Sequence, residues 1–278
     1  MGQHLSLTKI PKIYIFDIDD TLYAPELEYG KLIGNEMQKV MSSLDAYNTC
    51  TEEELEIIQS NLLQKYGTSI AGIAAESKLM INSQPLTYEE VYNKLNTNLE
   101  IRYYYSLFRS DPNLYNFINK LILNRCKIFC FTNGDHTHAK KILSKLKIYD
   151  ILYNSNKDFL ISFDTFNSKS FTQDVPVICK NKSDTHAFSL AFTHICKSLK
   201  LTCSKKVKKN IIFFDDSYNN IKSARKFGFN TVYVCKYDRD NTVLSEILPQ
   251  HKILFTQDYS YESLTDDYQY CQIPYFLL

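Results

Sequence analysis

Three carboxylates follow an apolar run near the start of the chain. Residues 13–16 are Ile-Tyr-Ile-Phe, and Asp17, Asp19 and Asp20 come after them within four positions. An apolar run that ends in charge is typical of a buried parallel strand, and ligands bind at the carboxyl ends of such strands. Asp17 and Asp19 project to the same side of an extended chain, where they repel each other unless a divalent cation lies between them. A bare Asp-x-Asp is more often a polar turn, so the rest of the chain must decide between a turn and a cation site.

Two further apolar runs end in polar residues, and a lysine stands before a predicted helix between them. Because the carboxyl ends of parallel strands share one edge of a sheet, these groups should converge on the aspartates. Carboxylates, hydroxyl and amide groups and an ammonium are the parts that hold Mg²⁺ and a phosphoryl group. The residues are Thr132 and Asn133 after 126–131, Asp215 and Asp216 after 210–214, and Lys180.

Strand and helix patterns alternate along the rest of the chain, which predicts an α/β fold with a doubly wound parallel sheet. Residues 164–174 lack periodicity and are expected to form a surface loop, as is the basic stretch 205–209. The predicted strands are 13–17, 126–131, 159–163, 210–214 and 231–235, with an edge strand at 253–256.

Residues 25–108 show helical periodicity and no convincing strand. A stretch of this length is too long for a loop and indicates a small domain of its own. We therefore predict two units: a core formed by residues 1–24 and 109–278, and an inserted helical domain formed by residues 25–108.

The bulk composition is that of an ordinary soluble globular protein. The 278 residues are 44% hydrophobic and 23% charged, and the net charge of +1 argues against binding a nucleic acid polymer. No apolar run is long enough to span a membrane, and no signal-peptide pattern opens the chain. The eight cysteines are dispersed, without a metal-ligand pattern, so we expect reduced thiols in a cytoplasmic protein.

The order of these motifs resembles the haloacid dehalogenase (HAD) superfamily of phosphohydrolases. The likeness extends to its eukaryotic pyrimidine 5′-nucleotidase branch and covers the chain from about Tyr14 to Cys235. It implies a Rossmann-like HAD core, an inserted helical C1-type cap and Mg²⁺ as cofactor. The resemblance is carried by residues 16–23, 65–68, 132–134 with 138–139, 176–180, and 213–217 with 220–221.

The resemblance implies an aspartyl-phosphate mechanism. Asp17 would attack phosphorus, while Asp19 would protonate the leaving oxygen and later deprotonate the hydrolytic water. Asp17, the backbone carbonyl of Asp19 and Asp216 would hold Mg²⁺, with Asp215 either a direct ligand or one step removed.

The resemblance also implies that Thr132, Asn133 and Lys180 bind the phosphoryl oxygens, and that Lys180 restrains Asp17. Asn181 departs from the branch, which usually has proline there, and this is expected to loosen the loop that holds Lys180. The mechanism needs no histidine, so three histidines are assigned to helix starts or the core: His136, His138 and His186.

The branch implies a nucleoside 5′-monophosphate as substrate, UMP or CMP, with Tyr66, Thr68 and Ser69 of the cap facing it. Another small phosphate (a lysophospholipid, pyridoxal phosphate or a sugar phosphate) and a non-catalytic phosphate-binding scaffold remain alternatives. Dehalogenation is disfavoured, because it has no use for the acid Asp19. No protein partner is indicated.

The amino terminus fits an N-myristoylation pattern through Gly2 and Ser6. One acyl chain binds membranes only marginally, so a second signal is needed. The starts of the first and fourth predicted strands should be neighbours and would bring six lysines together, on the edge opposite the aspartates. We therefore predict peripheral membrane contact through Gly2 and these lysines: Lys9, Lys12, Lys205, Lys206, Lys208 and Lys209.

Overall fold

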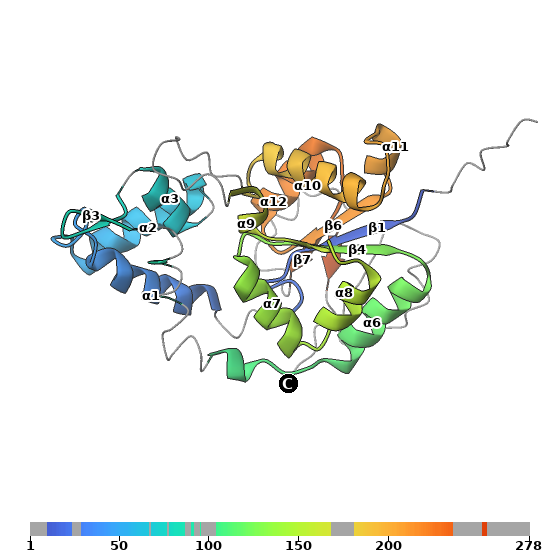
Figure 1. Ribbon diagram of the computed structural model, residues 1–278, viewed down its shortest axis with the longest axis horizontal. Helices are drawn as coiled ribbons and strands as arrows, with labels where there is room; N and C mark the ends of the chain where they lie inside the picture. Colours follow the sequence, from blue (N-terminus) through green and yellow to red (C-terminus); the bar gives the residue numbers. More distant parts are fainter. Residues whose placement is uncertain are drawn as a thin grey trace, which may run out of the picture.

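A six-stranded parallel sheet forms the centre of the protein (Figure 1). The computed structural model describes residues 10–23, 29–66, 68–76, 78–86, 90–91, 95, 104–167, 181–235 and 252–254. The sheet order confirms the predicted doubly wound α/β fold. The strands, in that order, are β5 (Leu160–Ile161), β4 (Lys127–Phe131), β1 (Ile13–Phe16), β6 (Ile211–Asp215), β7 (Asn230–Cys235) and β8 (Lys252–Leu254), and every pair is parallel.

Strand β1 is buried on both faces because its side chains alternate between two cores. Tyr14 and Phe16 join the core on one face, and Ile13 and Ile15 join the core on the other. Figure 1 shows one set of helices below the sheet and another above it. The first set is α6 (Pro112–Leu123), α7 (His136–Lys145) and α8 (Tyr149–Ser155), and the second includes α10 (Thr185–Ser198) and α12 (Tyr218–Phe227).

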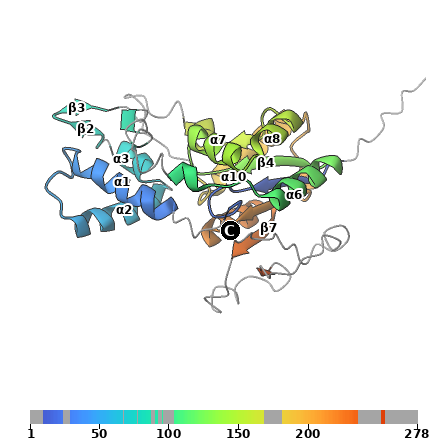
Figure 2. The same ribbon diagram turned by 90° about the horizontal axis from the view of Figure 1, so that it is seen from below.

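A separate group of helices lies at one end of the sheet, as Figures 1 and 2 both show. We call this group the helical lobe. It contains a short hairpin that the sequence analysis did not predict, in which Asn82 and Ser83 adopt positive φ angles and donate backbone N–H groups to Asp45. The lobe consists of α1 (Tyr29–Ser42), α2 (Glu52–Tyr66), α3 (Ser69–Ala75), β2 (Met80–Ile81) and β3 (Gln84–Pro85).

Two segments predicted to be loops are wholly or partly helical. Helix α9 (Phe163–Asn167) replaces the start of the expected 164–174 loop, and residues 168–174 lie outside the described ranges. Helix α11 (Lys205–Lys208) replaces most of the basic loop, because the Ser204 side chain accepts a hydrogen bond from the Val207 N–H and caps it.

The starts of β1 and β6 are neighbours, as the membrane hypothesis requires, since the Ile13 N–H donates to the Asn210 carbonyl at 2.9 Å. Lys208, however, lies over the Phe227 ring, 3.6 Å from its centroid, and is engaged within the fold. Gly2 and Lys9 lie outside the described residues. Within the described part of the chain, no helix has the length and apolar character to span a membrane. Acyl anchoring and a cytoplasmic location stay predictions.

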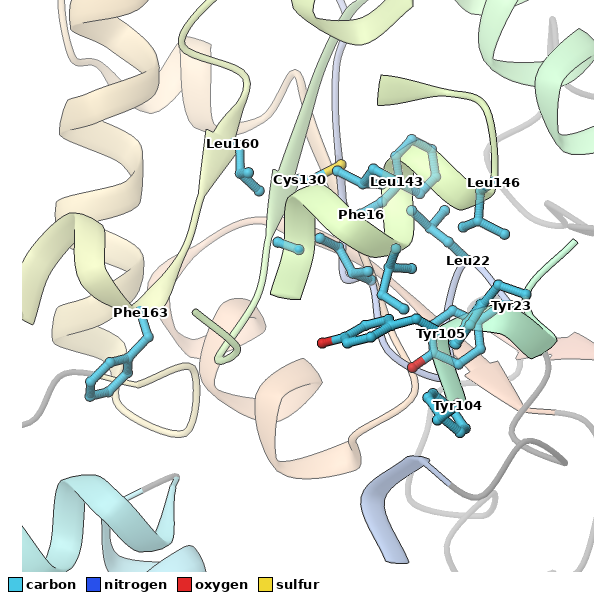
Figure 3. Close-up of a cluster of buried hydrophobic side chains, with 14 of the residues drawn as sticks. Phe16, Leu22, Tyr23, Tyr104, Tyr105, Cys130, Leu143, Leu146, Leu160 and Phe163 are labelled. Atoms are coloured by element: carbon cyan, nitrogen blue, oxygen red, sulfur yellow. The ribbon is translucent and has the colours of Figure 1, made fainter. Parts of the chain in front are cut away.

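An aromatic cluster lies where the chain leaves the core and where it returns (Figure 3). Tyr23 follows the first aspartates, and Tyr104 and Phe108 precede α6. The Phe108 ring packs edge-on against both tyrosines, at centroid distances of 4.7 and 5.0 Å. The points where the chain leaves the core at Tyr23 and returns to it at Tyr104 are therefore packed together beside the carboxyl end of β1.

Candidate active site

Three carboxylates meet at the carboxyl ends of β1 and β6. The strands pair in register, Phe16 beside Phe214, so Asp17 and Asp215 leave the sheet at the same level. One oxygen from each of Asp17, Asp215 and Asp216 lies within 4.8 Å of the others. The convergence predicted for the two strand ends is therefore present in the structure.

The ammonium of Lys182 joins these carboxylates. Its Nζ lies 2.6 Å from Oδ1 of Asp17 and 2.8 Å from Oδ2 of Asp215, and its side chain is only 2% exposed. The sequence analysis gave this place to Lys180, which lies outside the described residues. The lysine that pairs with Asp17 among the described residues is Lys182, two positions later, and we assign the restraint of Asp17 to it.

The loop that carries Lys182 is fixed by side chains on both sides. The Asn133 Oδ1 accepts a hydrogen bond from the Lys182 backbone N–H at 2.9 Å. Asn181 is buried, and its Oδ1 accepts the Ser183 N–H at 2.9 Å. Asn181 therefore forms a turn with its own side chain. The expectation that it loosens the loop holding Lys180 concerns residues outside the described ranges and stays a prediction.

Thr132 follows β4 and is buried at the same edge of the sheet. Its Oγ1 accepts the Gly134 N–H at 2.8 Å, so the hydroxyl hydrogen can be donated to a ligand oxygen. Thr132, Asn133 and Lys182 thus bring hydroxyl, amide and ammonium groups to this edge of the sheet. Groups of these kinds donate hydrogen bonds to phosphoryl oxygens.

The charge balance of the cluster fits a divalent cation. Burial raises the pKa of Asp17 well above its ordinary value, and Asp215 and Asp216 add to this although Lys182 opposes it. Burial, then Asp215, raises the pKa of Asp216 to about 7. Burial alone would lower the pKa of Lys182, but Asp17 and Asp215 raise it, so the ammonium stays charged. Three carboxylates facing one ammonium are oxygen ligands of the kind that Mg²⁺ prefers.

We expect Mg²⁺ to stabilise the protein more at about pH 8 than at about pH 5. The raised pKa values of Asp17 and Asp216 mean that the folded, metal-free protein holds protons that the unfolded chain has released. The protonated Asp17 and Asp216 carboxyls contribute to stability below the ordinary pKa of about 4. This contribution is lost as the pH rises through the raised pKa values of the folded protein. Mg²⁺ competes with those protons, so the stabilisation it provides should grow over the same interval.

Thermal unfolding with and without Mg²⁺ at the two pH values measures this effect. At a Mg²⁺ concentration of roughly 100 times Kd, the stabilisation is about 2.7 kcal/mol. Asp216→Asn should remove most of the Mg²⁺-dependent shift in Tm. An equal shift at both pH values, or an undiminished shift in Asp216→Asn, would contradict the assignment.

Asp19 lies beside this cluster and is held by two side chains. Its Oδ1 accepts hydrogen bonds from the Tyr23 hydroxyl at 2.6 Å and from Nε2 of His138 at 2.7 Å. Burial alone would raise the pKa of Asp19, but His138, followed by Tyr23, lowers it below its ordinary value. The assignment of His138 to the helix start or core overlooked this contact. Its position on the first turn of α7, directly after the polar end of β4, was the available signal.

A cavity of about 340 Å³ lies between Asp19 and the helical lobe. Thr68 and Ser69, two of the three predicted cap residues, line it, and Thr68 also caps α3 by accepting the Ala71 N–H. Tyr66 does not line it; the Tyr66 ring packs instead against Gly72. Most of the remaining lining is apolar or polar and uncharged. It includes Gly30, Ile33, Gly34, Met37, Gln59, Leu63, Ile70, Leu95, Asn133 and Gly134.

Comparison with known proteins identifies one family. The model of the haloacid dehalogenase-like hydrolase family matches residues 11–228. No match was found among curated proteins.

Several solved structures are similar to this chain. A protein assigned as a beta-phosphoglucomutase from Thermotoga maritima is 16% identical, with 84% of this chain and 90% of that one covered and a TM-score of 0.48. A predicted phosphoglycolate phosphatase from Haemophilus somnus is 18% identical, covering 81% and 86%, with a TM-score of 0.45. L-2-haloacid dehalogenase from Xanthobacter autotrophicus is 15% identical, covering 85% and 81%, with a TM-score of 0.44. Similarities at this level say nothing about the substrate of this chain.

Proposed function

The chain belongs to the haloacid dehalogenase-like hydrolase family, and on that premise we propose that it is a Mg²⁺-dependent phosphomonoesterase. The observation that carries the proposal is the arrangement around Asp17. Its carboxylate is paired with Lys182, adjoins Asp215 and Asp216, and lies near Asp19, which lines a cavity. A nucleophile, a cation site and an acid–base group are thus present together.

The reaction follows from these side chains. An Asp17 oxygen attacks phosphorus, the bond from phosphorus to the leaving oxygen breaks, and Asp19 gives its proton to that oxygen. Asp19 then takes a proton from water, whose oxygen attacks the aspartyl-phosphate and releases phosphate and Asp17. Lys182 keeps Asp17 in place and compensates negative charge. When bound, Mg²⁺ would be held by Asp17, Asp216 and the backbone carbonyl of Asp19, with Asp215 either a further ligand or one step removed, and would neutralise charge on the phosphoryl oxygens.

The lowered pKa of Asp19 does not prevent it from acting as an acid. An approaching phosphate dianion adds negative charge next to this carboxylate. That charge raises the pKa of Asp19 and favours the protonated form that the first step needs. The second step has the opposite requirement, because Asp19 must be ionised to take a proton from water. The hydrogen bonds from His138 and Tyr23 to Asp19 favour the ionised form.

We assign the helical lobe the role of a cap that selects the substrate. Among the described residues that line the cavity there is no lysine or arginine, while Asp19, Asp20 and Asp135 are present. A leaving group with a second phosphate or a carboxylate would find no cation there, so an uncharged leaving group is favoured. This supports a nucleoside 5′-monophosphate over phosphorylated acids and sugar bisphosphates. Within that class we propose UMP or CMP, the substrates that the family resemblance implies.

A screen of phosphate release tests the proposed function. Purified protein is assayed with Mg²⁺ and with EDTA against nucleoside 5′-monophosphates, p-nitrophenyl phosphate, pyridoxal phosphate, a lysophospholipid phosphate and sugar phosphates. Mg²⁺-dependent release with UMP or CMP preferred is the expected result. Preference for another phosphate would support phosphatase activity and reject a nucleotide as the substrate. No release from any of them would reject the proposal.

Ser69→Ala is expected to change the ranking of substrates. Ser69 is buried in the helical lobe and lines the cavity, so losing its hydroxyl should lower kcat/KM for UMP or CMP by about tenfold while p-nitrophenyl phosphate changes less than about threefold. Ser60→Ala, on an exposed part of α2, is the matched control and should change neither value. Equal losses on every substrate would assign Ser69 a folding role.

A further inference from the structure

His138 is buried between Asp19 and Tyr105. Its side chain is 3% exposed, its Nε2 lies 2.7 Å from Oδ1 of Asp19, and its Nδ1 lies 2.9 Å from the Tyr105 hydroxyl. Each ring nitrogen therefore has a partner at hydrogen-bond distance.

The partners determine which nitrogen of the neutral ring carries the hydrogen. An ionised Asp19 can only accept, so Nε2 must donate. In a neutral imidazole Nδ1 is then an acceptor, and the Tyr105 hydroxyl donates to it. Asp19 thus selects the tautomer, and the Tyr105 hydroxyl supports it by donating to Nδ1.

Both donors to Asp19 meet the same oxygen. Tyr23 and His138 reach Oδ1, at 2.6 and 2.7 Å. Oδ2 lies toward Gly134, where a Cβ atom would stand 3.6 Å from Oδ2 and 3.0 Å from Cδ2 of His138. The glycine therefore lets the His138 ring approach, while a Cβ atom would be only in ordinary contact with Oδ2.

We propose that His138 is a positioning residue, which holds Asp19 by Oδ1 so that Oδ2 exchanges the proton with the leaving oxygen and later with water. The inference rests on the proposed phosphatase function. It assigns His138 a role that it exerts through Asp19. Two donors on one oxygen fix the rotation of the carboxylate, and a fixed carboxylate delivers its proton along one direction.

The test compares two phosphates of similar shape that differ in their need for an acid. p-Nitrophenolate leaves without a proton, whereas the alcohol of benzyl phosphate must be protonated as it leaves. General-acid catalysis contributes about 10²–10⁴-fold, so His138→Phe should lower kcat/KM by about 100-fold for benzyl phosphate and by about threefold for p-nitrophenyl phosphate. The ratio kcat/KM reports the step in which the leaving group departs, and so excludes hydrolysis of the intermediate.

Two more variants separate positioning from folding. His138→Gln keeps an N–H near the place of Nε2 and should recover at least about tenfold of the benzyl phosphate activity that His138→Phe loses. Tyr105→Phe leaves the His138 ring in place but removes the hydroxyl that donates to its Nδ1. It should show the same selective loss to a smaller degree. Thermal unfolding of each variant shows whether it is folded.

The outcomes are distinct. A selective loss on benzyl phosphate with rescue by His138→Gln supports the inference. Equal losses on both phosphates, or no loss on either, in folded His138→Phe and Tyr105→Phe overturn it and leave the phosphatase function standing. A wild-type protein inactive on both phosphates with Mg²⁺ would overturn the proposed function and this inference with it.

Discussion

Asp17→Asn is expected to lower the turnover of phosphate release by roughly 10⁴-fold or more, as removal of a nucleophile does in other enzymes. The amide nitrogen and oxygen of asparagine cannot form the acyl-phosphate bond. The fold should survive, because Lys182 keeps its ion pair with Asp215 and the carboxylate cluster loses one repelling charge. The measurement is steady-state phosphate release together with the thermal unfolding curve.

Asp20→Asn is the matched control for this variant. Asp20 carries the same side chain three positions away, with φ at 55°, a conformation that asparagine tolerates well. It should retain turnover within about tenfold of wild type. If Asp17→Asn kept more than about one hundredth of the wild-type rate, Asp17 would not be the nucleophile.

Lys182→Met is expected to cost both activity and stability. The ammonium is buried between Asp17 and Asp215, and removing it leaves carboxylates without their counter-charge. Breaking a buried pair in this way costs about 3–5 kcal/mol, and solvent screening reduces this little because Lys182 is 2% exposed. Turnover should fall by about 10²–10³-fold, the scale of removing one charge-stabilising donor. Urea unfolding and phosphate release measure the two effects.

Two further variants make this prediction specific. Lys180→Met should have turnover and stability close to wild type, which tests the reassignment of the lysine directly. Lys182→Met combined with Asp215→Asn removes one of the buried charges left without a counter-charge and should recover part of the lost stability without recovering activity. A loss of activity in Lys180→Met as large as in Lys182→Met would restore the original assignment.

The strand ends were predictable because their signal is local. An apolar run followed at once by Asp17, Thr132 or Asp215 specifies both the strand and the point where it leaves the core. Once the strands are parallel, their carboxyl ends must lie on one edge. The sheet and the three clusters at its edge therefore followed from residue order.

The short hairpin of the helical lobe and helix α9 were missed for the opposite reason. Residues 80–85 and 163–167 are too short to show a period. The hairpin is held by Asp45, far away in sequence, which accepts the N–H groups of Asn82 and Ser83. A contact of that kind has no trace in the local pattern.

The sequence by itself determined which strand ends meet at the aspartates, but it assigned Lys180 to the place beside Asp17, where the tertiary structure has Lys182. Two lysines flank Asn181 in a stretch without periodicity, so either could point inward. The Lys182 backbone N–H is held by Asn133, and its side chain is buried between carboxylates from two other strands. His138 is the same case, because its role comes from contacts with Asp19 and Tyr105. Residue types and strand ends are encoded locally, whereas the pairing of charges across the sheet edge depends on packing between distant segments.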